Sequence, residues 1–129
     1  MANKSKAKGT AAETKVARYL SGRGLPTKRK ALAGSLDEGD LCMTLPNGKE
    51  ITIEVKTGKQ TWNYNRRQMM DWKFQTLVEG NNSHCRSVLI IVRYRRLFRD
   101  SEVWLPNRDN KGWTMMYLDE FVEFCKGGK

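Results

Sequence analysis

The chain has 129 residues, with 24 Lys and Arg against 14 Asp and Glu, which gives a net charge of +10. This length fits one domain with a single core, and the charge favours a polyanionic partner, nucleic acid first and an anionic membrane surface second. The longest apolar run, Val88 to Val92, is far shorter than the roughly 20 residues that span a bilayer, and the basic N-terminus lacks the apolar stretch of a secretory signal.

Cysteine and histidine usage limits the chemistry further. The chain has three cysteines and one histidine, His84. The cysteines are scattered, without a Cys-x-x-Cys pair, which argues against a disulfide framework or a zinc site and favours a reducing, cytoplasmic location. A single histidine excludes any mechanism that needs two.

The N-terminal part is predicted to contain a helix and a short strand. Residues 1–9 are expected to form a flexible basic arm, and residues 10–126 a single domain. Thr10 and Glu13 fit a capping box that opens a helix. Glycines at 22 and 24 end this helix, and a basic strand over 27–33 and a loop over 34–39 follow.

A β-hairpin is predicted next. Apolar residues alternate over 41–45 and 51–55, on both sides of a turn. The two apolar sets must share the buried face, so Asp40 falls on the same face as Glu54 and Lys56. A five-residue loop would place Asp40 opposite Glu54, and a three-residue loop would place it opposite Lys56. Paired Cβ atoms are about 4.5–5.5 Å apart, close enough for two carboxylates to hold one metal ion.

The second half of the chain completes a mixed α/β fold. Arg66 to Glu79 predicts a helix that ends at Gly80 and turns four apolar residues inward: Met70, Phe74, Leu77 and Val78. The remaining expected elements are a central strand over 87–94, a shorter strand over 102–105, a loop over 106–112 and a helix over 117–125. The predicted architecture is a central mixed sheet of about five strands flanked by helices, in the order αβββαββα.

The acids around the hairpin suggest a metal site for phosphodiester hydrolysis. Asp40, Glu54 and the Val55 carbonyl are oxygen donors of the kind that Mg²⁺ prefers, and Mn²⁺ is expected to substitute. Such an ion neutralises a phosphate and acidifies a bound water, while Lys56 could orient that water or stabilise charge on phosphorus. The alternative is an ordinary salt bridge across the hairpin. Glu13 could be a capping acid or, from the inward face of its helix, bind a second ion or a metal-bound water.

Basic and aromatic residues on either side of these acids predict contacts with DNA. Such a mixture can stack on bases while it grips the backbone. The alternatives are a solvated basic edge strand, which blocks aggregation, and a packed loop and helix start. The predicted DNA-binding residues are Lys28, Arg29, Lys30, Ser35, Lys59, Trp62, Tyr64, Arg66, Arg67 and Gln68.

Three segments resemble a known family: Gly9-Thr10-x-x-Glu13, Gly34-Ser35…Gly39-Asp40-Leu41 and Ile53-Glu54-Val55-Lys56-Thr57. In them the sequence resembles the PD-(D/E)XK nuclease superfamily, most closely the archaeal-type Holliday junction resolvases, over residues 8–80. The resemblance implies a restriction-endonuclease-like fold, a homodimer, and an active site of Glu13, Asp40, Glu54 and Lys56, with Ser35 as the nearest match to a loop serine. Gly39 replaces a proline frequent in the family, and nothing after residue 80 is diagnostic.

The sequence therefore predicts a Mg²⁺-dependent endodeoxyribonuclease, a homodimer that makes paired nicks in branched DNA. Two alternatives stay open. One is a related nuclease of repair, replication or restriction that cuts flaps, ends or duplex DNA. The other is a non-catalytic basic DNA-binding module. No membrane partner and no small-molecule cofactor beyond the divalent metal are expected.

Overall fold

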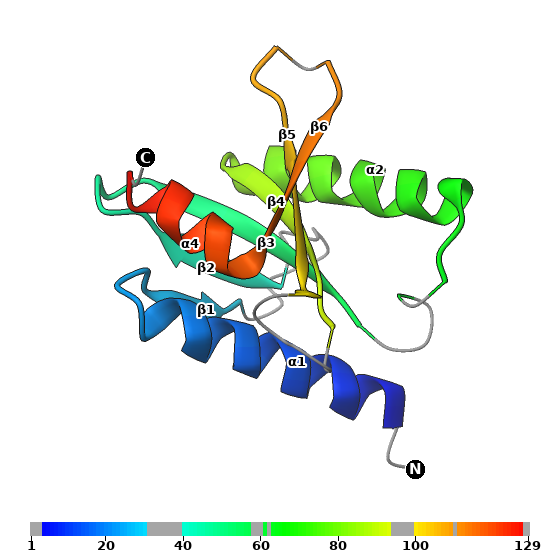
Figure 1. Ribbon diagram of the computed structural model, residues 1–129, viewed down its shortest axis with the longest axis horizontal. Coiled ribbons are helices and arrows are strands. Elements are labelled where there is room, and N and C mark those ends of the chain that lie inside the picture. The colour runs from blue at the N-terminus through cyan, green and yellow to red at the C-terminus, as the bar shows by residue number, and fades with distance from the viewer. Residues whose placement is uncertain are drawn as a thin grey trace.

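The computed structural model describes residues 4–30, 40–57, 61, 63–93, 100–109 and 111–127. The elements are α1 (Lys4–Ser21), β1 (Thr27–Arg29), β2 (Leu41–Thr44), β3 (Glu50–Lys56), α2 (Arg66–Ser83), β4 (Arg86–Ile91), β5 (Glu102–Pro106), β6 (Trp113–Tyr117) and α4 (Leu118–Cys125). Figure 1 shows the strands in one sheet, in the order β1-β2-β3-β4-β5-β6. Only β3 and β4 are parallel; the other neighbouring strands are antiparallel.

Helices cover both faces of the sheet. The larger core cluster joins α1 and α4 to one face, where Leu20 and Phe121 are fully buried against residues such as Ile53. The smaller cluster joins α2 to the other face through Met69 and Trp72. The polar residues of the hairpin lie on the α2 face, because they alternate along β3 with the residues of the larger core.

The predicted mixed α/β architecture is confirmed, but the sheet has six strands instead of about five. The additional strand is β6, so the order is αβββαβββα. Its sequence, Trp-Thr-Met-Met-Tyr, lacks the strict alternation that marks a half-buried strand. The turn that precedes it stabilises the β5–β6 hairpin: the Asn107 N–H donates to the Gly112 carbonyl at 3.1 Å, and Gly112 has a φ of 82° that favours glycine.

Helix α1 begins earlier than the sequence analysis predicted. It starts at Lys4, so residues 4–9 are helical and Thr10 lies inside the helix. The segment before Thr10 contains lysine and alanine, which are good helix formers, and the helix extends through Gly9 despite its low propensity. The predicted cap at Thr10 is therefore wrong.

The predicted inward face of α2 is also wrong. Met70 is 58% exposed and Phe74 68% exposed, and Leu77 and Val78 are exposed as well. The buried residues of the helix are Met69, Trp72, Thr76, Glu79 and Gly80. The face that packs on the sheet is part aromatic and part polar because it covers both the Leu89–Ile91 cluster and the polar residues of β3.

Gly80 continues α2 instead of ending it. The helix runs to Ser83 and is capped by His84, which has a left-handed φ of 58°. A Cβ atom at position 80 would lie 2.6 Å from Ser87 Oγ and 3.0 Å from the Cys85 carbonyl oxygen. Glycine is needed here because α2 approaches the start of β4 closely.

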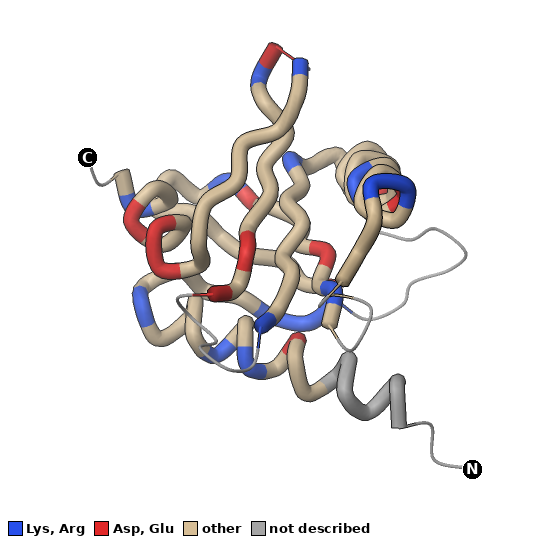
Figure 2. Tube along the Cα trace, turned by 45° about the vertical axis from the view of Figure 1, so that its right-hand side comes forward, with Lys and Arg blue, Asp and Glu red and all other residues tan. Residues whose placement is uncertain are grey.

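The charge of the chain is spread over many elements. Figure 2 shows Lys and Arg on helices and strands alike, with none of these elements holding most of them. Within the described residues, the model contains no helix with both the length and the apolar character that crossing a membrane requires. All three cysteines are free thiols.

Candidate active site

The register of β2 and β3 brings two acids together. Leu41 pairs with Ile53 and Thr44 with Glu50, so the hairpin has the five-residue loop. Asp40 immediately precedes β2, its N–H donates to the Ile53 carbonyl at 3.0 Å, and its side chain lies next to that of Glu54, with which it hydrogen-bonds. The alternative that placed Asp40 opposite Lys56 does not occur.

Backbone and side-chain contacts hold this pair in place. Asp40 Oδ2 accepts a hydrogen bond from the Val55 N–H at 2.9 Å. Lys56 Nζ lies 3.1 Å from Glu54 Oε2 and donates to Gln75 Oε1 on α2 at 2.9 Å. Glu54 is only 4% exposed, so water contributes little to its solvation.

The surroundings of Glu54 oppose its negative charge. Burial, the nearby Asp40 and a hydrogen bond with Glu79 raise the pKa of Glu54 to about 10. The Lys56 ammonium does not cancel these effects, although it contacts Glu54 directly. Glu79 itself is fully buried on α2. The fold thus gathers three carboxyl groups in a poorly solvated place, an arrangement that is typical of functional sites.

This donor set fits one divalent cation. Among the described residues, no group of three or more His, Cys, Asp and Glu side chains is arranged to hold a metal ion. Asp40 and Glu54 supply two carboxylates, which is the usual protein contribution to a Mg²⁺ site that water and phosphate complete. The positive charge of an ion would offset the repulsion that raises the pKa of Glu54.

Glu13 reaches the same site from α1. Its Oε1 atom accepts from Arg29 Nε on β1 at 3.1 Å. Burial and the negative charge of Asp40 raise the pKa of Glu13, which places Asp40 within electrostatic reach. Of the two roles considered for Glu13, capping is wrong, because the helix begins at Lys4.

The arrangement of the elements matches that of a solved structure. A scan of protein-family models and a search of curated proteins give no match. The chain is similar to Hjc of Archaeoglobus fulgidus, a Holliday junction resolvase from an archaeal hyperthermophile, with a TM-score of 0.51 and 18% identity, over 88% of this chain and 89% of that one. The chain shares the fold of this solved structure. At this identity the likeness concerns the fold, and the chemistry of the site depends on the residues themselves.

Two of the basic residues predicted to bind DNA, one at the end of β1 and one directly after it, already have protein partners. Arg29 binds Glu13, and Lys30 Nζ donates to Thr52 Oγ1 at 3.0 Å. Thr52 Oγ1 in turn lies 2.8 Å from Ser83 Oγ, which links β3 to the end of α2. Lys28 is exposed and available to a ligand.

The residues that follow the hairpin differ in their surroundings. Arg66 and Arg67 are exposed in the first turn of α2, and Gln68 is partly exposed beside them. The Asn65 side chain caps this turn by accepting from the Gln68 N–H at 2.8 Å. Three predicted contacts, Ser35, Lys59 and Trp62, lie outside the described residues.

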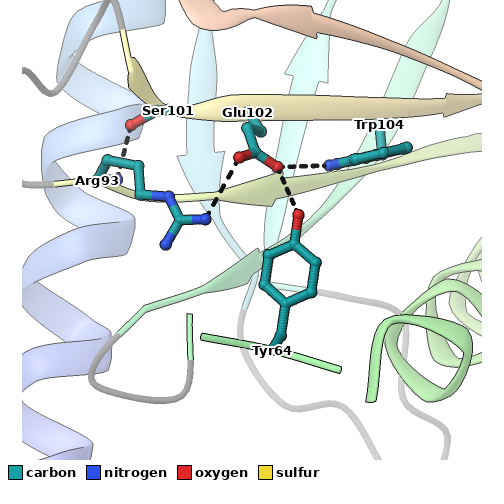
Figure 3. Close-up of polar contacts among 5 residues, drawn as sticks. All are labelled: Tyr64, Arg93, Ser101, Glu102 and Trp104. Atoms are coloured by element: carbon teal, nitrogen blue, oxygen red, sulfur yellow. Dashed lines mark hydrogen bonds and ion pairs between the residues drawn. The ribbon is translucent and has the colours of Figure 1, made fainter. Parts of the chain in front are cut away.

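Tyr64 belongs to a polar cluster centred on Glu102, shown in Figure 3. Glu102 Oε1 accepts from the Tyr64 hydroxyl at 3.0 Å and from Trp104 Nε1 at 3.0 Å. The other carboxylate oxygen, Oε2, lies 3.3 Å from Arg93 Nη2. The backbone N–H of Arg93 donates to Ser101 Oγ at 2.9 Å. The Tyr64 hydroxyl therefore anchors the segment before α2 to β5. This contact corresponds to the packed loop that was the alternative to a DNA contact.

Sequence analysis did not identify two residues of the candidate site. Gln75 and Glu79 are four positions apart on α2 and contact Lys56 and Glu54, respectively. They lie on the side of α2 that faces the sheet, opposite the exposed apolar stripe. Their spacing was visible in the sequence, but it indicates a site only once the inward face of α2 is known.

Proposed function

We propose that this protein is a divalent-metal-dependent DNA endonuclease that resolves four-way junctions as a homodimer. The observation that carries the proposal is the side-by-side placement of Asp40, Glu54 and Lys56 at the end of the β2–β3 hairpin. The resolvase fold supports it, because the similar archaeal structure is of a Holliday junction resolvase. The net charge of +10 supports a nucleic-acid partner.

Asp40 and Glu54 would hold the ion, with the Val55 carbonyl as a third donor. When bound, Mg²⁺ would neutralise the phosphate and lower the pKa of water. Lys56 places a positive charge next to these acids, where it stabilises the charge that develops on the phosphate. Glu13 adds a further acid from α1 that positions solvent at the same place.

The outer face of α2 supports the homodimer. Met70, Phe74, Leu77 and Val78 form an apolar stripe along one side of this helix, and all four are exposed. Such a stripe at helical spacing is normally buried against another element. A second copy of the chain would bury it, with the two-fold symmetry that is commonest among dimers. Two active sites would then be available to two opposed strands of a junction.

Substrate choice is tested by competition. A labelled four-way junction, a flap and a linear duplex are mixed in one reaction with Mg²⁺, and the products are resolved on a denaturing gel. Paired symmetric nicks in the junction, made before the other substrates are cut, support the resolvase. Preferential cutting of the flap or duplex would instead indicate a repair or restriction nuclease with the same site, because one fold serves several substrates.

A further inference from the structure

The ammonium group of Lys56 is held between two elements. Glu54 Oε2 lies 3.1 Å from Nζ and belongs to the same strand, two residues earlier. Gln75 Oε1 accepts from Nζ at 2.9 Å and belongs to α2. The side chain of Lys56 is 18% exposed, so part of it remains accessible to solvent.

These two contacts leave one donor. A lysine ammonium has three N–H groups. Glu54 and Gln75 use two of them, from β3 and from α2, so the third is fixed in direction. A free lysine side chain samples many rotamers, worth about 2 kcal/mol of conformational entropy. A second acceptor from a separate element removes much of that freedom before substrate arrives.

A neutral acceptor suits this position. Asp40, Glu54 and Glu79 already crowd three carboxyl groups around the strand end. A fourth carboxylate would increase their repulsion and compete with the phosphate for the lysine. The carbonyl oxygen of a glutamine provides the hydrogen bond without the charge.

We propose that Gln75 is a positioning residue that aims the free N–H of Lys56 at the scissile phosphate. This inference rests on the proposed function of the same site. Gln75 acts through Lys56 and does not itself touch the substrate. In this way α2 contributes to the chemistry, because it supplies the acceptor that orients the lysine of β3.

The test compares Gln75→Leu, which removes the acceptor at similar volume, with Gln75→Glu, which keeps an acceptor at the same reach. Single-turnover cleavage of a four-way junction is measured with enzyme in excess, next to the junction Kd and the thermal midpoint. We expect Gln75→Leu to cleave about 10- to 100-fold more slowly, as is typical when a supporting hydrogen bond is lost. Its Kd should stay within about twofold, because Lys56 keeps its charge. Gln75→Glu restores the acceptor but adds a charge, so it should cleave faster than Gln75→Leu and more slowly than the wild type.

The control is Asn81→Leu, the same kind of change on the exposed last turn of α2. It should leave the cleavage rate unchanged. The inference is overturned if Gln75→Leu cleaves like the wild type, or if Gln75→Leu and Gln75→Glu are equally slow, since a purely structural role would give the latter. If the wild type cuts none of the DNA substrates, the proposed function fails first, and the role assigned to Gln75 fails with it.

Discussion

The carboxyl group of Glu54 and the ammonium of Lys56 are 3.1 Å apart, yet this contact is too weak to keep the acid in its charged form. Burial and two neighbouring carboxyl groups outweigh it and raise the pKa of Glu54 to about 10. A group of this kind costs folding energy at neutral pH and is retained where function needs it.

The stability of the metal-free protein should therefore depend on pH through Glu54. An unfolded chain loses the Glu54 proton above the ordinary pKa of 4.5, whereas the folded protein keeps it until about 10. The folded state thus binds more protons between these values, and its free energy of unfolding falls as pH rises, by up to about 1.4 kcal/mol per pH unit. Glu54→Gln should remove this part of the slope, measured by urea unfolding in EDTA between pH 5.5 and 8.5. Glu123→Gln, on exposed α4, is the control. Parallel curves for wild type and Glu54→Gln would contradict the account.

Glu13→Gln separates a catalytic role from a structural one. The Glu13–Arg29 pair is 3.1 Å long, and the arginine side chain is 50% exposed, so the pair stabilises the fold little. We expect the free energy of unfolding to change by less than about 1 kcal/mol. Single-turnover cleavage should fall at least about tenfold, within the range of a lost acid–base or solvent-positioning group. An unaltered cleavage rate combined with a clear loss of stability would assign Glu13 to structure alone.

The apolar stripe on α2 predicts which substitution would disrupt the proposed dimer. Phe74 is 68% exposed, so Phe74→Glu should leave the fold of the protomer intact. In a dimer that buries this face, the new charge would be desolvated, and the protein should become monomeric in light scattering. Phe124→Glu places the same charge on another exposed apolar residue, 60% exposed on α4, and should leave the dimer unchanged. If Phe124→Glu makes the protein monomeric and Phe74→Glu does not, the interface lies on α4 and not on α2.

Alanine is the better helix former by about 1 kcal/mol. Gly80→Ala should nevertheless destabilise the protein. The added methyl group would lie 2.6 Å from Ser87 Oγ and 2.9 Å from Ser87 Cβ. We expect a net loss of about 1–3 kcal/mol in chemical denaturation, as for other overpacked sites. Gly80→Ala combined with Ser87→Gly should recover part of it. A single variant as stable as the wild type would show that α2 and β4 can move apart at little cost.

The hairpin was predictable because its pattern is local and strict. Alternation fixed the buried faces of β2 and β3, and hence the common face of Asp40, Glu54 and Lys56. The loop length was left open by the sequence, since both turns keep that alternation. In the structure the Leu45 N–H donates to the Lys49 carbonyl at 2.8 Å, and this hydrogen bond closes the five-residue loop.

The orientation of α2 was not predictable in the same way. A stripe of Met, Phe, Leu and Val normally marks the inward side of a helix. Here the inward side carries Trp72 together with polar residues, because half of it packs on the sheet and half lines the site. The contacts of Gln75 and Glu79 therefore depended on tertiary structure that no local pattern specifies.

The most direct test of the central claim is Mg²⁺-dependent cleavage of a synthetic four-way junction by wild-type protein and by Asp40→Asn, which keeps the shape of the side chain but removes its charge. The wild type should make paired nicks with Mg²⁺ and none with EDTA, while Asp40→Asn should bind the junction and leave it intact. Cleavage by Asp40→Asn at the wild-type rate, or cleavage by the wild type in EDTA, would contradict a metal site built on Asp40 and Glu54.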